Sequence, residues 1–161
     1  MEAITYHPIG VIHSPFKQKT GTPIQSAFAP DAEGRVEVFE EFAEGLKDVE
    51  LFSHLLLLYA FHQARSSSLT VVPFLDEASH GVFATRAPSR PNAIGLSIVR
   101  LVERTGRIMR VRELDILDGA PLLDIKPFVP RFDMRPDAGS GWLPETEHPR
   151  TIDGADERFG A

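Results

Sequence analysis

Residues 81–101, GVFATRAPSRPNAIGLSIVRL, place two apolar runs of strand length on either side of a short polar connector. The connector carries Pro88, Pro91 and Gly95, so its backbone path is largely fixed before any ligand binds. A connector of this length cannot hold the crossover helix that joins parallel strands. The stretch therefore favours a mainly β fold.

Short apolar runs bounded by Pro, Gly and Ser recur along the chain, which is typical of strands joined by turns. About eight runs qualify, and they cover residues 4–12, 35–39, 54–61, 69–74, 81–85, 94–103, 107–114 and 121–128. Residues 54–61 are continuously apolar, which predicts a strand buried on both faces. Residues 40–46 are the one convincing helical stretch, and residues 17–34 are predicted to form an ordered loop or flap.

Short strands at regular spacing predict a single compact β-barrel over residues 1–132, with one or two short helices. Beyond Phe132 the sequence becomes polar and rich in Pro and Gly. We expect residues 133–161 to form an extended C-terminal tail that docks on the barrel or on a partner subunit. Its apolar residues able to act as anchors are Trp142, Leu143 and Ile152.

Composition narrows the functional classes. The 161 residues fit one domain, and the absence of cysteine excludes disulfides, thiol nucleophiles and zinc sites with cysteine ligands. The six histidines show no pair at metal-ligand spacing, so we expect no metal site. The N-terminus does not resemble a signal peptide, and no apolar run is long enough to span a bilayer. We therefore expect a cytoplasmic protein with no membrane partner.

Charge is distributed unevenly. The net charge is −6, but residues 81–112 contain seven arginines and one acid, a local charge of +6. Residues 31–50 contain eight acids against two basic residues, a local charge of −6. This asymmetry would allow a basic face on an acidic protein. A solvated strand edge would give the same count.

Four polar clusters stand at the ends of apolar runs, where the strands of a barrel usually form a ligand mouth. They are Pro23-Ile24-Gln25, residues 62–65, residues 86–95 and residues 115–119. In the third cluster, Arg86, Arg90 and Asn92 on a rigid backbone suit an anion or a nucleotide-like ligand. A tight turn with solvated arginines fits the same residues.

Several of these side chains also fit structural roles. His62 follows an apolar strand, where a hydrogen-bonded structural histidine is common. Asp115 and Asp118 suit a turn, and Asp124 and Lys126 suit a cross-strand charge pair. No P-loop or GxSxG motif is present, and no GxGxxG motif follows a strand. A nucleotide cofactor would therefore need a site of another design.

Five phrases of the sequence, taken together, resemble the YaeB/TsaA/TrmO-like family. They are IGVIHSPFK, the PxQ of Pro23 to Gln25, FSHLLLLYAFHQ, GVFATRAPSRPNAIGLS and LDILDGAPLLDIKPF, in this order over residues 9–128. The resemblance implies a compact β-barrel that binds S-adenosylmethionine. It also implies methylation of N6 in threonylcarbamoyladenosine at position 37 of tRNA, by a homodimer whose cofactor site lies near the subunit contact.

Carried over by motif, the resemblance implies a set of site residues. The expected cofactor contacts are Pro23, Ile24, Gln25, His62, Gln63, Arg86, Leu96, Asp118, Gly119, Ala120, Pro121 and Leu122. The candidate proton acceptors are Asp115, Asp124 and His62, because the N6 proton must leave during methyl transfer. Arg90, Asn92 and Lys126 are expected to contact the substrate.

The sequence looks like a short form without the further C-terminal domain of longer bacterial members, and residues 133–161 are acidic. An acidic segment does not help to hold RNA. Two alternatives therefore stay open beside tRNA methylation. One is a methyltransferase of a small molecule or a protein, and the other is a noncatalytic S-adenosylmethionine-binding module.

Overall fold

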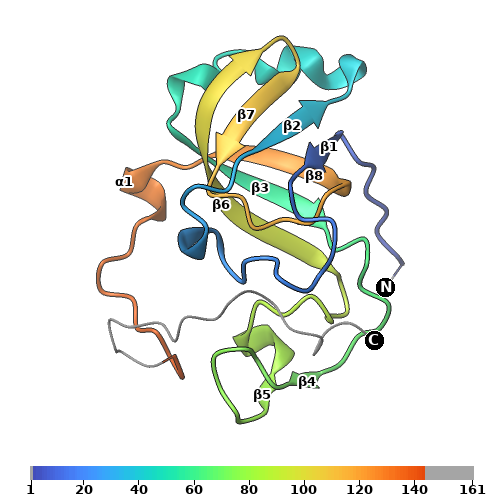
Figure 1. Ribbon diagram of the computed structural model, residues 1–161, viewed down its shortest axis with the longest axis vertical. Coiled ribbons are helices and arrows are strands. Elements are labelled where there is room, and N and C mark those ends of the chain that lie inside the picture. The colour runs from blue at the N-terminus through green and yellow to red at the C-terminus, as the bar shows by residue number, and fades with distance from the viewer. Residues whose placement is uncertain (1, 144–161) are drawn as a thin grey trace.

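The computed structural model describes residues 2–143, and the strands among them form a closed antiparallel barrel (Figure 1). The order around the barrel is β1-β2-β7-β6-β3-β8, with β8 pairing again with β1. The barrel strands are β1 (Gly10–His13), β2 (Gly34–Val38), β3 (His54–Ala60), β6 (Ile94–Thr105), β7 (Ile108–Arg112) and β8 (Ala120–Pro127). The predicted β-barrel is confirmed.

Short helices and a small second sheet complete the described chain. The helices are 3-10 turns η1 (Ser26–Phe28), η2 (Glu40–Leu46), η3 (Val49–Leu51) and η4 (Val82–Ala84), and α1 (Pro130–Asp133). The second sheet pairs β4 (Thr70–Val71) with β5 (His80–Gly81). Figure 1 shows this pair below the barrel, at the end away from the turn between β6 and β7.

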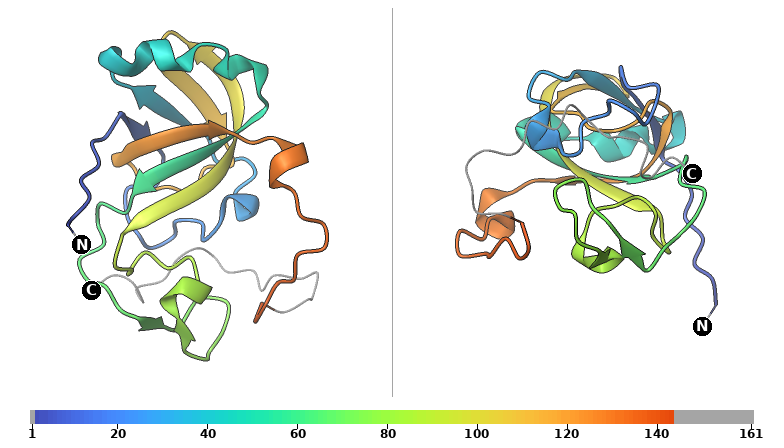
Figure 2. Two further views of the ribbon diagram at one scale, coloured as in Figure 1. Left: turned by 180° about the vertical axis from the view of Figure 1, so that it is seen from behind. Right: turned by 60° about the horizontal axis from the view of Figure 1, so that its bottom comes forward.

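The core fills the inside of the barrel. On β3, Leu55, Leu57 and Tyr59 are buried, whereas Leu56 and Leu58 on the outer face are half-buried. The expectation that this strand is buried on both faces is therefore wrong. A barrel encloses only one face of each strand. β3 pairs with β6 on one side and with β8 on the other, and its outer face points away from the core (Figure 2).

Three predicted strands are much shorter than expected. Residues 4–9 are not strand, and only Thr70–Val71 and His80–Gly81 pair within residues 69–85. Pro8 and Pro73 lack the N–H that a longer ladder needs. Residues 82–84 turn as η4 instead, with the Thr85 hydroxyl donating to the Val82 carbonyl at 2.9 Å.

The described part of the tail, up to residue 143, reaches the small β4–β5 unit. The Trp142 indole N–H donates to the Ala84 carbonyl at 2.8 Å, and its ring stacks on His80 with 4.4 Å between centroids. His80 in turn contacts Asp76 at 2.8 Å. The predicted anchor Ile152 lies outside the described residues, as does the rest of the tail.

Candidate functional site

A cavity of about 920 Å³ lies between one end of the barrel and the β4–β5 unit. The barrel contributes the ends of β3 and β6 and the loop after β7. The rest of the wall comes from the loop around η1 and from residues 61–64, 73–75, 83–90 and 139–143. The lining is mainly apolar with a few polar side chains, which is the usual make-up of a small-molecule site.

Residues 83–96, which contain the short polar connector, form one wall of the cavity. Arg90 turns inward to its own loop, where its guanidinium donates to the carbonyls of Val82, Thr85 and Ala87 at 3.3–3.4 Å. Arg86 instead crosses the cavity and donates to Gln25 Oε1 at 2.7 Å. Arg90 thus shapes the loop, and Arg86 presents a cation at the cavity wall.

Asp115 is the acidic group in the cavity. Its Oδ1 accepts from the Ser97 hydroxyl at 2.6 Å, and Ser97 Oγ lies 3.2 Å from the Tyr59 hydroxyl. Burial raises the pKa of Asp115 to about 6, while the Ser97 hydroxyl, the Ser26 N–H and the Arg86 charge oppose that rise. Burial also raises the pKa of Tyr59, and the Asp115 carboxylate adds to the effect. A carboxylate with a pKa near neutrality is suited to accept a proton.

The cavity brings together most of the residues singled out in the sequence. Those in its lining are Pro23, Ile24, Gln25, His62, Gln63, Arg86, Arg90, Leu96, Asp115 and Ala120. They come from separate stretches of the chain, which only the closed barrel places side by side. Their roles remain predictions.

The other predicted cofactor contacts are not in the lining of the cavity. Asp118 accepts from the Ser14 N–H at 2.9 Å and pairs with Lys17 at 2.7 Å, and both partners keep the pKa of its carboxyl low. Gly119 forms the turn before β8 with a φ of 78°. Pro121 follows on β8, and the side chain of Leu122 is fully buried in the core.

The structure does not bring Asn92, Asp124 or Lys126 to this cavity. Asn92 is exposed in the connector. Asp124 pairs with Lys126 at 2.7 Å, and Asp124 lines a second cavity of about 680 Å³ beside η2. The cross-strand pairing expected for these two charges does not occur, because both residues belong to β8.

Some lining residues had no signal in the sequence analysis. Tyr59 stands in an apolar strand, where it looks like an ordinary core residue. Phe28 and Phe83 line the cavity although 45% and 77% of their side chains are exposed. Ser97 is a polar residue in the apolar run of β6, opposite the apolar strand β3. Its position was the one sign in the sequence of a buried polar contact.

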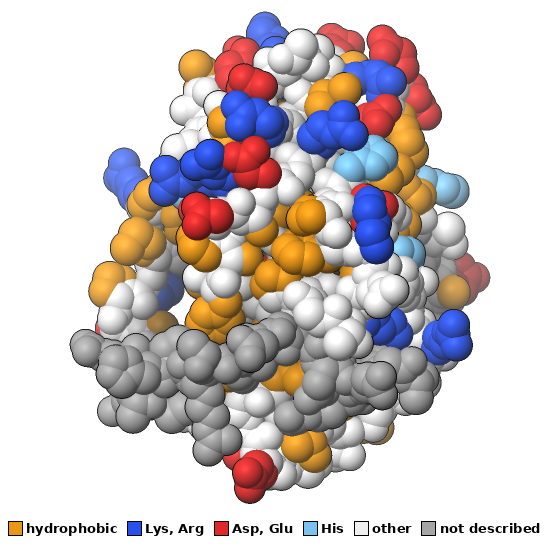
Figure 3. Space-filling view, viewed as in Figure 1, with side chains coloured by type: hydrophobic (Ala, Val, Ile, Leu, Met, Phe, Trp, Pro, Cys, Tyr) orange, Lys and Arg blue, Asp and Glu red, His pale blue; other side chains and the backbone are white. Residues whose placement is uncertain are grey.

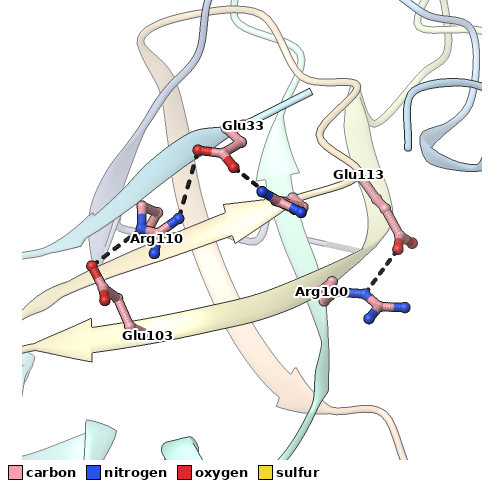
Figure 4. A network of polar contacts seen from close by, with 6 residues as sticks. Glu33, Arg100, Glu103, Arg110 and Glu113 are labelled. Atoms are coloured by element: carbon pink, nitrogen blue, oxygen red, sulfur yellow. Dashed lines mark hydrogen bonds and ion pairs between the residues drawn. The ribbon is translucent and has the colours of Figure 1, made fainter. Parts of the chain in front are cut away.

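The arginine-rich stretch does not form an open basic face. Five of its seven arginines pair with glutamates, mostly from residues 31–50. Glu33, for example, lies between Arg110 and Arg112, and Arg100 pairs with Glu113 (Figure 4). Acidic and basic side chains accordingly alternate over the upper part of the molecule (Figure 3). Most of the arginine charge in this stretch is thus neutralised by glutamates.

Residues 2–143 contain no cluster of three or more His, Asp or Glu side chains arranged to hold a metal ion. Over the same residues, no helix has the length and apolar character needed to cross a membrane.

The comparisons with known family models, sequences and structures all indicate one family. The tRNA-methyltransferase O N-terminal domain model matches residues 11–134. A probable S-adenosyl-L-methionine-binding protein of Pyrococcus abyssi is 61% identical over 145 residues, which are 90% of this chain and 79% of that protein. The tRNA (adenine(37)-N6)-methyltransferase of Escherichia coli is 37% identical over 152 residues, covering 88% of this chain and 65% of that enzyme.

A solved structure has the same fold. The crystal structure of TrmO from Pseudomonas aeruginosa superposes with a TM-score of 0.75 at 40% identity. The match covers 89% of this chain and 64% of that chain. This chain thus spans just under two thirds of the Escherichia coli and Pseudomonas aeruginosa relatives.

Proposed function

Because the chain belongs to the tRNA-methyltransferase O N-terminal domain family, we propose that it is an S-adenosyl-L-methionine-dependent methyltransferase acting on tRNA. The target would be N6 of threonylcarbamoyladenosine at position 37. The observation that carries the proposal is the convergence of Gln25, Arg86 and Asp115 on one mainly apolar cavity. A tRNA substrate also implies a cytoplasmic protein.

The residues of the cavity fit the cofactor. A volume of about 920 Å³ is at the upper end of the range for sites that bury a drug-sized ligand. Arg86 offers a guanidinium for the carboxylate of the methionine part, and Gln25 holds that guanidinium in place. Ile24, Leu96 and Phe61 supply apolar surface for the adenine part.

When bound, the cofactor supplies an electrophilic methyl group. The chain then has to align the acceptor nitrogen, exclude water and take up the N6 proton. Of the three candidate acceptors, Asp115 is favoured because it lines the cavity and has a pKa of about 6. His62 also lines the cavity, whereas Asp124 lies at the second cavity.

Exposed aromatic rings support a nucleic-acid substrate, and exposed apolar residues support a homodimer. Phe28 and Phe83 expose aromatic rings at the cavity, and unstacked RNA bases bind by stacking on such rings. Ile94 and Leu96 also line the cavity, and they are 38% and 46% exposed on the outer face of β6. A second copy of the chain would cover them, which supports a homodimer with the site near the subunit contact.

The paired arginines also fit a second candidate function, methylation of a small molecule or a protein. With five arginines of the stretch neutralised, binding of a small molecule or a protein in place of tRNA fits the described surface as well. Methyl transfer that is insensitive to salt and needs no RNA would favour that alternative. Tight cofactor binding without any turnover would favour a noncatalytic module.

Cofactor binding is tested by calorimetric titration with S-adenosyl-L-methionine. We expect Arg86→Ala to weaken binding by about tenfold or more, because it removes the charged partner of the cofactor carboxylate. Arg100→Ala is the matched control, since Arg100 pairs with Glu113 outside the cavity. Absence of binding in the unmodified chain, or equal binding in Arg86→Ala, would contradict the proposed cofactor site.

A further inference from the structure

Two consecutive buried hydrogen bonds link side chains from three segments at the inner end of the cavity. Tyr59 is on β3, Ser97 on β6, and Asp115 in the loop after β7. The Tyr59 and Ser97 hydroxyls are 3.2 Å apart, and Ser97 Oγ is 2.6 Å from Asp115 Oδ1. Tyr59 and Ser97 are only 5% and 3% exposed, so water does not replace these contacts.

The direction of the hydrogen bonds follows from the donors available. An ionised carboxylate only accepts, so the single Ser97 proton must be donated to Asp115. The Tyr59 hydroxyl must then donate to Ser97 Oγ. The phenol can do so at any physiological pH, because burial raises the pKa of Tyr59. Each hydroxyl therefore has one defined role.

The position of the Tyr59 ring is fixed by its neighbours. Tyr59 lies opposite Gly95 in the β3–β6 ladder, and a Cβ at Gly95 would come within 2.3 Å of the ring. The bare glycine backbone thus allows the ring to lie across β6 and to reach Ser97, two residues along the strand. Phe61 holds the ring from another side in an edge contact with 5.4 Å between centroids.

We propose that Ser97 and Tyr59 are positioning residues that fix the Asp115 carboxylate as the proton acceptor of the methyl transfer. This inference rests on the proposed function. As N6 forms its bond to the methyl group, the methyl–sulfur bond breaks with both electrons going to sulfur. The N6 proton passes to the Asp115 carboxylate, which later releases it to solvent. Held by Ser97 and the Ser26 N–H, the carboxylate keeps one orientation throughout.

The test compares Ser97→Ala with the conservative Ser97→Thr, with Ser53→Ala as a control at an exposed serine outside the cavity. We expect Ser97→Ala to lower kcat for tRNA about tenfold, with KM within about twofold, because only the orientation of the acceptor is lost. Ser97→Thr keeps the hydroxyl and should restore most of the rate. Tyr59→Phe should lower kcat in the same direction, since it leaves Ser97 without its donor.

A second readout needs no activity. The pKa of Asp115 is measured by carbon NMR of its carboxyl in the full chain without ligand. Loss of the Ser97 hydrogen bond should raise that pKa, because the bond favours the ionised form. The charged and titratable groups that share the cavity with Asp115 are Lys19, Tyr59, His62, Arg86 and Arg90, and all are retained.

The outcomes separate the two claims. An unchanged Asp115 pKa and an unchanged kcat in Ser97→Ala would overturn the positioning role. Full activity of Asp115→Asn would overturn the role of Asp115 as acceptor. If the unmodified chain methylates no tRNA while the Asp115 pKa still rises in Ser97→Ala, the proposed function fails and the hydrogen-bonded positioning of Asp115 stands.

Discussion

At the scale of single residues, Asp115 combines burial with charge. The group lies in a mainly apolar cavity, and burial raises the pKa of its carboxyl from 3.8 to about 6. The folded state therefore holds a proton over a pH range in which the unfolded chain has lost it. The contribution of Asp115 to folding stability is therefore greatest below pH 4, falls between about pH 4 and pH 6, and stays at its lowest above that.

Asp115→Asn should remove this dependence on pH. The variant carries no titrating group at residue 115, so its free energy of unfolding relative to the unmodified chain should rise between pH 4 and pH 7. The shift should be roughly 1–3 kcal/mol, the equivalent of a pKa change of up to about two units. Urea unfolding at the two pH values measures it. A constant difference between variant and unmodified chain would contradict the raised pKa.

Sequence patterns located the polar residues at strand ends but not those within strands. Gln25, His62 and Arg86 belong to the polar clusters between apolar runs, and they line the cavity. That they bind a ligand there stays a prediction. Tyr59 and Ser97 occupy inward positions that usually hold core residues. Their hydrogen bond to each other, and the one from Ser97 to Asp115, depend on the register of the barrel. Asp118, like Asp115, is an aspartate in the turn after an apolar run. It contacts Ser14 and Lys17, however, and does not line the cavity.

At the scale of elements, the hairpin of β6 and β7 carries its arginines as part of an ion-pair network with β2 and its flanks. Glu33, Glu37 and Glu103 each accept from arginines of this hairpin or of its turn. Hydrogen bonds from Arg107 and His13 keep the pKa of Glu37 low. The sequence showed the two opposite charge excesses, but only the pairing of β2 with β7 brings them into contact.

We expect Arg112→Gln to have little effect. The Arg112–Glu33 pair is exposed, so its loss should lower the free energy of unfolding by less than about 1 kcal/mol. Because the paired arginine is not free to bind phosphate, KM for tRNA should stay within about twofold of the unmodified chain. Urea unfolding and steady-state kinetics test both statements. A several-fold rise in KM with a shallower salt dependence would mean that the hairpin binds the RNA backbone.

The short strands show why element boundaries were harder to predict than the barrel itself. Period-2 alternation marked β2, and connectors too short for helices indicated antiparallel pairing. Residues 69–74 and 81–85 are as apolar as strands, yet they lie outside the barrel, where β4, β5 and η4 form. Apolar content alone does not distinguish a barrel strand from a segment that packs outside the barrel.

At the scale of the whole molecule, the site exists only where distant parts of the chain meet. The barrel supplies Tyr59, Ser97 and Asp115, the connector supplies Arg86, and the described end of the tail supplies Trp142. Trp142 closes one side by stacking on His80 of the β4–β5 unit. The cavity therefore lies between the barrel and smaller segments attached to it.

The most direct measurement is methyl transfer in vitro from S-adenosyl-L-methionine to an anticodon stem-loop RNA, followed by mass spectrometry of its nucleosides. One RNA carries threonylcarbamoyladenosine at position 37, and the matched RNA carries unmodified adenosine there. The account predicts that the first RNA gains one methyl group on N6, that the second gains none, and that Arg86→Ala and Asp115→Asn lose the activity. No methylation of either RNA, or equal methylation of both, would contradict it.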